Sequence, residues 1–290
     1  MSLEFDYAIA FSRNLGWVTD KEQAALREKR IAIAGMGGVG GLHLLTLARL
    51  GVGKFNIADH DSFELANFNR QAGAVVSTVG QPKVDVLAEM VRAINPTVEI
   101  GVFTDGVGGD NIDTFLNGVD LYIDGLDFFA FEARELVFAK CWERRIPAIT
   151  AAPLGMGAAV LNFLPGGMSF ADYFQLEGRP PLQKALRFLV GLAPRALHRG
   201  YLVDAGRVDL AAGRGPSTII ACTLCAGVAA AEALKILLGR GKVWGAPHGI
   251  QFDAYRNRLV QTWRPGGNRH PLNRLALAIA KRQFVQTDDV

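Results

Sequence analysis

The chain has 290 residues, half of them hydrophobic and a fifth charged, so it can bury a sizeable core and is not disordered. Its net charge of +3 is too mild to indicate nucleic acid as a partner. The three cysteines, Cys141, Cys222 and Cys225, suit a reducing compartment better than a disulfide framework. The N-terminus lacks the apolar core of a secretory signal, and no stretch of roughly 20 uninterrupted apolar residues occurs. We therefore expect a cytoplasmic protein without a membrane span.

The first half of the chain alternates between strand-like and helix-like runs. A polar N-terminal helical segment, 1–29, leads into a core over 30–164. Short apolar runs predict strands at 31–35, 54–59, 97–103, 119–125 and 147–152. Helical spacing of apolar residues predicts helices after the glycines that follow the first strand, at 81–95 and at 128–145. This alternation predicts a parallel sheet covered by helices on both faces.

The rhythm changes after Pro165. Residues 165–217 are rich in Gly, Pro and Arg and should form a crossover region with one basic amphipathic run at 182–199. That run could cover the domain's own core, lie on a membrane or hold a partner's acidic tail. Residues 218–265 predict a strongly apolar helix and a β-hairpin that complete the same domain, and 266–290 form a tail with a possible short helix. The predicted fold is α/β and Rossmann-like, a doubly wound, mainly parallel sheet with antiparallel C-terminal strands in three α/β/α layers.

A glycine-rich turn separates the first strand from the first core helix. Its glycines let the backbone approach phosphates, and the N-terminus of the following helix favours anions; they are Gly35, Gly37, Gly38 and Gly40. Asp59 ends the second strand about 20 residues further on, where an acid can accept hydrogen bonds from ribose hydroxyls. These features predict a nucleotide site, but an NAD-dependent dehydrogenase would show them equally well.

The segment 59–83, DHDSFELANFNRQAGAVVSTVGQPK, favours one of these possibilities. It resembles the signature of the ThiF/MoeB/HesA family, relatives of the ubiquitin-activating enzymes, at Asp59, Asp61, Asn67, Arg70, Gln71, Gly80 and Lys83. The resemblance extends from about Arg13 to the hairpin near residue 263. It implies an ATP-dependent adenylyltransferase that activates a carboxylate as an acyl-adenylate and releases pyrophosphate. The activated carboxylate would belong to a ubiquitin-like or sulfur-carrier protein, a peptide or a similar substrate.

Adenylation needs positioning and cations at the phosphate oxygens where charge develops. Arg70 can fork onto two phosphate oxygens, Lys83 supplies a mobile point charge, and Asn67 can position phosphate without adding charge. The resemblance also assigns Asp61 and Gln71 to the nucleotide site.

Two acids follow the fourth strand, Asp124 and Asp127. They resemble the family's D-x-x-D-N pattern, in which the second Asp is associated with Mg-ATP, so Asp127 is the Mg²⁺ candidate and Asp124 a nucleotide-site candidate. Phe128 stands where the family usually has Asn. Arg13 resembles an N-terminal arginine that, in related dimers, reaches the ATP of the partner subunit, which implies a homodimer.

Features of some relatives are missing. Only one Cys-x-x-Cys pair occurs, Cys222 and Cys225, so we expect no structural zinc. Residues 165–217 contain no cysteine, which argues against thioester transfer through the crossover region. Two other functions stay open, an NAD(P)-dependent oxidoreductase and a non-catalytic ATP-binding scaffold of the same family.

Overall fold

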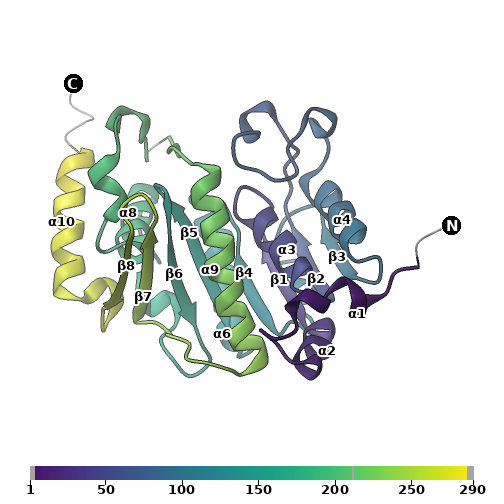
Figure 1. Cartoon of the computed structure of the whole chain (residues 1–290). Coiled ribbons are helices and arrows are strands. Elements are labelled where there is room, and N and C mark those ends of the chain that lie inside the picture. Colours follow the sequence, from purple (N-terminus) through teal and green to yellow (C-terminus); the bar gives the residue numbers. More distant parts are fainter. Residues whose placement is uncertain (1–3, 211, 286–290) are drawn as a thin grey trace.

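The computed structural model describes residues 4–210 and 212–285, and its centre is one eight-stranded sheet (Figure 1). The strand order is β3-β2-β1-β4-β5-β6-β7-β8. Neighbours from β3 to β5 are parallel, and β6, β7 and β8 join antiparallel. The strands are β1 Arg30–Ala34, β2 Lys54–Ala58, β3 Glu99–Phe103, β4 Leu121–Asp124, β5 Ala148–Leu154, β6 Gly157–Phe163, β7 His248–Asp253 and β8 Arg258–Trp263. The predicted fold class is confirmed.

Helices cover both faces of the sheet, as Figure 1 shows. The helices are α1 Tyr7–Ala10, α2 Asp20–Glu28, α3 Gly40–Arg49, α4 Lys83–Ile94, α5 Ile112–Phe115, α6 Phe131–Glu143, α7 Phe170–Phe174, α8 Pro181–Leu192, α9 Ile219–Leu238 and α10 Pro271–Val285. Among the short 3-10 turns, η2 spans Leu65–Asn67 and η4 spans Leu197–Tyr201.

The side chains of β1 show why both faces are covered. Ile31 and Ile33 point into a core shared with α3, α4 and α9, whereas Ala32 and Ala34 point into a second core shared with α5, α6, α7 and α8. All four side chains are fully buried. A strand that is apolar at every position has to be covered on both faces, so the continuous apolar run predicts the doubly wound arrangement.

Helix α9 is long and apolar enough to cross a membrane by length and composition alone. In this structure it packs against β5, β6 and α3. Thr218 caps its start, because the Thr218 hydroxyl accepts a hydrogen bond from the backbone N–H of Ala221, and Gly239 ends it with φ +60°. Small buried residues, mainly alanine, allow the helix to approach the sheet closely.

The structure adds strand β6 and the short helices α5 and α7 to the predicted elements, and it decides between the alternatives for the basic amphipathic run. Strand β6 is absent from the predicted strands; it returns from β5 through a tight turn at Gly155, where φ is +63°. The basic amphipathic run forms α8, whose apolar side is buried, so the alternative in which it covers the domain's own core is the one observed. Helix α10 packs on α8.

The arrangement brings several chain segments to one edge of the sheet. Parallel strands β1, β4 and β5 end at the same edge, and α3 begins there directly after β1. The start of α9 lies at this edge as well, because the Thr218 hydroxyl donates a hydrogen bond to the Gly155 carbonyl, 3.4 Å away. In open α/β sheets, ligands bind outside the carboxyl ends of the strands, which makes this edge the place to look for a site.

Candidate functional site

The glycines of the turn after β1 have two different roles. Gly35 has φ +86°, and a Cβ there would lie 2.2 Å from the carbonyl oxygen of Gly125, after β4. A Cβ on Gly40 would lie 1.7 Å from the Gly35 carbonyl oxygen. These glycines are therefore required by backbone packing. A Cβ on Gly37 would meet no atom closer than 3.9 Å, so the packing around Gly37 leaves room beside the backbone.

Asp59 joins the glycine turn to the loop 59–83. Its Oδ2 accepts a hydrogen bond from the backbone N–H of Met36 at 2.6 Å, and its Oδ1 accepts one from the N–H of Asp61 at 2.8 Å. The side chain is only partly buried. Each carboxylate oxygen has a second lone pair, so Asp59 can hold the turn and still accept hydrogen bonds from a ribose.

Lys83 is buried and paired, rather than being a mobile charge on the surface. It is the first residue of α4, its side chain is 7% exposed, and its Nζ lies 2.8 Å from Oδ2 of Asp61. The hydrogen bond from Lys83 lowers the pKa of Asp61 below its ordinary value, although partial burial of Asp61 opposes this. A phosphate that approaches Lys83 would therefore compete with a carboxylate that already holds it.

Arg70 lies across the glycine turn. If Gly38 carried a Cβ, the Cγ of Arg70 would be 3.3 Å away from it and the Sγ of Cys222 3.0 Å away. The Arg70 Nη1 donates hydrogen bonds to the carbonyl of Ala66 at 3.0 Å and to Oδ1 of Asn69 at 2.9 Å. Both of these hydrogen bonds use Nη1 of Arg70. Its Nε and Nη2 can therefore donate hydrogen bonds to two oxygens of one phosphate.

Two amide residues of the loop, Asn67 and Gln71, are buried. Asn67 Oδ1 accepts a hydrogen bond from the N–H of Glu64 and so closes the 3-10 turn η2. Gln71 is 7% exposed, near Gly37, and its Oε1 has no hydrogen-bond partner within the described part of the chain. Asn67 thus stabilises the conformation of the loop, a role that the sequence pattern does not reveal. The side-chain carbonyl of Gln71 lies near the turn and can still accept a hydrogen bond.

Asp124 forms a buried ion pair. Its Oδ2 accepts hydrogen bonds from Arg134 Nε and from the Thr150 hydroxyl, both at 2.8 Å. The guanidinium of Arg134 also donates to the backbone carbonyls of Leu126, Asp127 and Phe128. The sequence analysis did not identify Arg134. The signal that could have identified it is that Arg134 is the one charged residue at the helical spacing of the apolar residues that α6 buries. Asp124 therefore anchors the loop after β4.

Asp127 is exposed on that loop. Its Oδ1 accepts a hydrogen bond from the N–H of Phe129 at 2.9 Å, and this bond does not use Oδ2. One free carboxylate oxygen fits the ligand set of Mg²⁺, which takes one or two protein carboxylates besides phosphates and water. The neighbouring Phe128 ring lies in an aromatic cluster with Phe129, Phe131 and Phe188, so this position is used for packing.

A second group of possible metal ligands occurs on the loop after β2. Ligand atoms of Asp59, His60 and Asp61 lie within 4.8 Å of one another. Two of these carboxylates are already engaged, Asp59 with backbone N–H groups and Asp61 with Lys83. We therefore regard the group as part of the loop scaffold.

Arg13 does not join the other candidates within this chain. It lies in the short 3-10 turn Ser12–Asn14, and the neighbouring Asn14 donates a hydrogen bond to the carbonyl of Leu50, at the C-terminal end of α3. The glycine turn is at the opposite end of α3, about 15 Å away for a helix of 10 residues.

The cysteines of α9 are core residues. Cys222 and Cys225 are fully buried, and burial raises the pKa of both thiols. A protonated, buried thiol is a poor nucleophile. Cys222 packs next to Gly38 of the glycine turn, and its Sγ lies 3.8 Å from the hydroxyl of Ser217.

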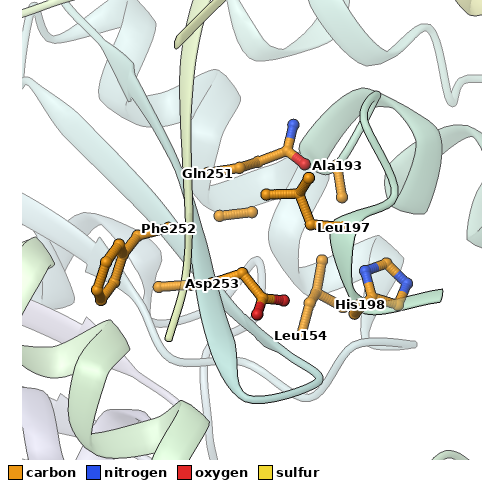
Figure 2. Close-up of a pocket in the computed structure, with 9 residues that line it drawn as sticks. Leu154, Ala193, Leu197, His198, Gln251, Phe252 and Asp253 are labelled. Atoms are coloured by element: carbon orange, nitrogen blue, oxygen red, sulfur yellow. The ribbon is translucent and has the colours of Figure 1, made fainter. Parts of the chain in front are cut away.

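A small pocket of about 10 Å³ lies at the same sheet edge, between η4 and strands β5 to β7. Figure 2 shows the Gln251 and Asp253 side chains extending from β7 toward Leu197 and His198. The Tyr201 hydroxyl donates to Oδ2 of Asp253 and accepts from the N–H of Met156, both at 2.7 Å. These bonds fix the crossover region to the turn between β5 and β6, and through Thr218 to the start of α9.

The glycine turn, the acid after β2 and the loop 59–83 thus lie together on a Rossmann-like sheet. The model of the ThiF family matches residues 11–275, so the chain belongs to the ThiF family, as the resemblance implied. A tRNA threonylcarbamoyladenosine dehydratase of Bacillus subtilis is 35% identical over 150 residues, which are 51% of this chain and 57% of that protein. The chain spans about half the length of the curated relatives it matches.

Solved structures show the same fold. PaaA has a TM-score of 0.66 at 19% identity, with 90% of this chain and 74% of that chain covered. E. coli tRNA N6-threonylcarbamoyladenosine dehydratase in complex with ATP has a TM-score of 0.59 at 23% identity, with 82% and 98% covered.

Proposed function

We propose that this chain binds Mg-ATP over the glycine turn and transfers its adenylyl group to a carboxylate. The observation that carries the proposal is the return of the loop 59–83 onto the turn. Asp59 holds the N–H of Met36, and the stem of Arg70 crosses Gly38. An oxidoreductase that binds NAD(P) would use the same turn but would have no need for Arg70, Lys83 and Asp127 together.

In the proposed reaction an oxygen of the acceptor carboxylate attacks the α-phosphorus of ATP. The new O–P bond forms while the bond to the β-phosphate oxygen breaks, so pyrophosphate leaves and an acyl-adenylate remains. Asp59 would orient the ribose, and Nε and Nη2 of Arg70 would stabilise the negative charge on phosphate oxygens. Lys83 would exchange Asp61 for a phosphate oxygen. The N-terminus of α3 would contribute the partial positive charge of its unpaired N–H groups.

Asp127 is the residue that would hold Mg²⁺. The bound ion would neutralise charge on the phosphates as pyrophosphate forms. Arg134 supports this role because it binds the backbone carbonyl of Asp127 and so fixes the loop that presents the carboxylate. The packed ring of Phe128 replaces a polar contact that the family pattern would supply, and Gln71 lies near enough to the turn to provide another.

The acceptor in this proposal is a small protein or peptide with a free carboxylate, and the catalytic unit is a homodimer in the cytoplasm. Arg13 would reach the nucleotide of the partner subunit, since it lies too far from its own. The buried thiols of α9 support a reaction that stops at the acyl-adenylate or passes it to an external nucleophile.

The test has two stages. Calorimetry should detect binding of ATP in the presence of Mg²⁺ and much weaker binding of NAD⁺; tighter binding of NAD⁺ would refute the proposal. Exchange of labelled pyrophosphate into ATP is then measured with fractions of small proteins and peptides as acceptors. We expect one fraction to support exchange, and Asp127→Ala to abolish it while the protein stays folded. Asp113→Ala, which removes an exposed aspartate on α5, is the matched control.

A further inference from the structure

The C-terminal part of the chain has an unusual charge. Residues 254–290 contain only two acids, Asp288 and Asp289, and their cations are Arg256, Arg258, Arg264, Arg269, Arg274, Lys281 and Arg282. The segment therefore carries a charge of +5, whereas the whole chain carries +3, which leaves a net charge of −2 for the remainder. Charge is thus concentrated on β8 and α10, a region that the adenylation site does not use.

Helix α10 has two apolar stripes, and only one of them is covered. Leu277 is buried against α8, in a cluster with Leu186 and Val190. The other stripe faces solvent, with Leu272, Leu275 and Ile279 exposed to 55%, 59% and 47%. Their spacing of three and four residues places them on one side of the helix. Exposed cations flank this stripe, namely Arg274, Lys281 and Arg282.

Strand β8 also carries exposed apolar side chains, on the face of the sheet that α9 covers. It is the last strand of the sheet, and Leu259 and Trp263 are 62% and 60% exposed on one side of it. Arg264 links the strand to the helix, because its Nε donates to Oδ1 of Asn273 in α10 and its Nη1 to the carbonyl of Trp263. Figure 1 shows α10 beside β8 at one end of the molecule, with α3 and α4 toward the other end. A partner on β8 and α10 would therefore leave the glycine turn accessible.

The positive charge and the exposed apolar side chains together indicate what kind of partner binds β8 and α10. A second copy of the chain in a two-fold contact would bring this cationic segment against itself, which is unfavourable. A nucleic acid would be attracted to the cations but would gain nothing from an aliphatic stripe. An anionic bilayer uses both features, because the aliphatic and Trp side chains enter the headgroup region while Lys and Arg meet anionic headgroups. We propose that the β8–α10 surface binds the surface of an anionic lipid membrane.

Vesicle sedimentation tests this with the full chain. We expect it to pellet with phosphatidylcholine vesicles that contain phosphatidylglycerol, and not with phosphatidylcholine alone, and we expect added salt to weaken binding. Two variants should each lose at least about tenfold in partitioning, Leu275→Ser with Ile279→Ser, and Arg274→Gln with Lys281→Gln and Arg282→Gln. Their melting temperatures and ATP binding verify that they stay folded.

A matched variant removes three exposed cations elsewhere, Lys21→Gln with Arg49→Gln and Arg92→Gln on α2, α3 and α4. It should keep nearly all of the binding. Equal loss in this control, or pelleting that the serine variant leaves unchanged, would mean that only net charge acts and would overturn the proposal. Two further results would overturn the proposal. The first is that tRNA displaces the vesicles and that its binding is unchanged in the Leu275→Ser, Ile279→Ser variant. The second is that this variant turns a dimer into a monomer while its lipid binding stays the same.

Discussion

The Nε atom of Arg134 lies 2.8 Å from Oδ2 of Asp124, and both side chains are almost fully buried. The same guanidinium binds three successive carbonyls of the loop that carries Asp127 and stacks over the Phe188 ring, 4.6 Å from its centroid. One helix residue therefore fixes the end of β4, the loop that follows it and a face of the aromatic cluster.

Replacing Arg134 by Ala should destabilise the protein strongly. The change leaves the Asp124 carboxylate buried without its cation and frees three carbonyls, so we expect a loss of about 3–5 kcal/mol in the free energy of unfolding. Urea denaturation measures it. Arg144→Ala removes an exposed partner of Asp113 and should cost at most about 1 kcal/mol. Equal effects of the two changes would contradict the importance of burial.

Gly40→Ala should disrupt the turn, because the new methyl group would overlap the Gly35 carbonyl. We expect a loss of at least about 2 kcal/mol in stability, together with loss of ATP binding. The control is Gly227→Ala in α9, where a Cβ would meet nothing within 4 Å. Alanine is the better helix former, so this control should gain about 0.5–1 kcal/mol. A stable, ATP-binding Gly40→Ala protein would show that the turn relaxes.

Arg70→Ala should impair adenylation with little effect on folding. Loss of a cation aimed at phosphate oxygens should cost about 2–4 kcal/mol of transition-state stabilisation, measured as kcat/KM in pyrophosphate exchange. Arg70→Lys should restore little of it, because lysine lacks the planar fork. Arg92→Ala, an exposed arginine on α4, is the control. An unchanged rate would mean that Arg70 serves only the loop through Ala66 and Asn69.

His43 should make the protein sensitive to acid. It is 1% exposed, neither ring nitrogen has a hydrogen-bond partner among the described residues, and burial lowers its pKa from 6.5 to about 4. Between these values the unfolded chain binds a proton that the folded protein does not. Stability should therefore fall as pH decreases from 6.5 toward 4, by a total of about 3 kcal/mol from this group.

The comparison is with His43→Leu, whose stability should lack this part of the pH dependence. His60→Gln removes an exposed histidine, with 76% of its side chain accessible, and should retain the dependence. Urea midpoints across this pH range provide the measurement. Parallel pH profiles for the native protein and His43→Leu would mean that His43 finds a partner in solution.

The sequence alone predicted the doubly wound sheet, the boundaries of the longer core helices α4, α6 and α9 to within a few residues, and the family; it did not predict the short helices α5 and α7. Those features depend on local patterns, such as the continuous apolar run of β1 and the glycines after it, or on the ordered residues of the 59–83 segment. The sequence also predicted that the Mg²⁺ and phosphate candidates lie near one edge of the sheet, because the carboxyl ends of parallel strands meet at the same edge.

Only the tertiary structure decided how these residues are held. Lys83 and Asp61 are 22 residues apart, yet they form a pair that masks the lysine's charge. Arg134 reaches Asp124 from the next helix, and the Gly40 backbone abuts Gly35 too closely for a side chain. Burial and partner choice depend on contacts between distant segments, and composition and periodicity carry no information about them. For the same reason, the sequence predicted a short helix in the tail but not that α10 would leave a second apolar stripe exposed.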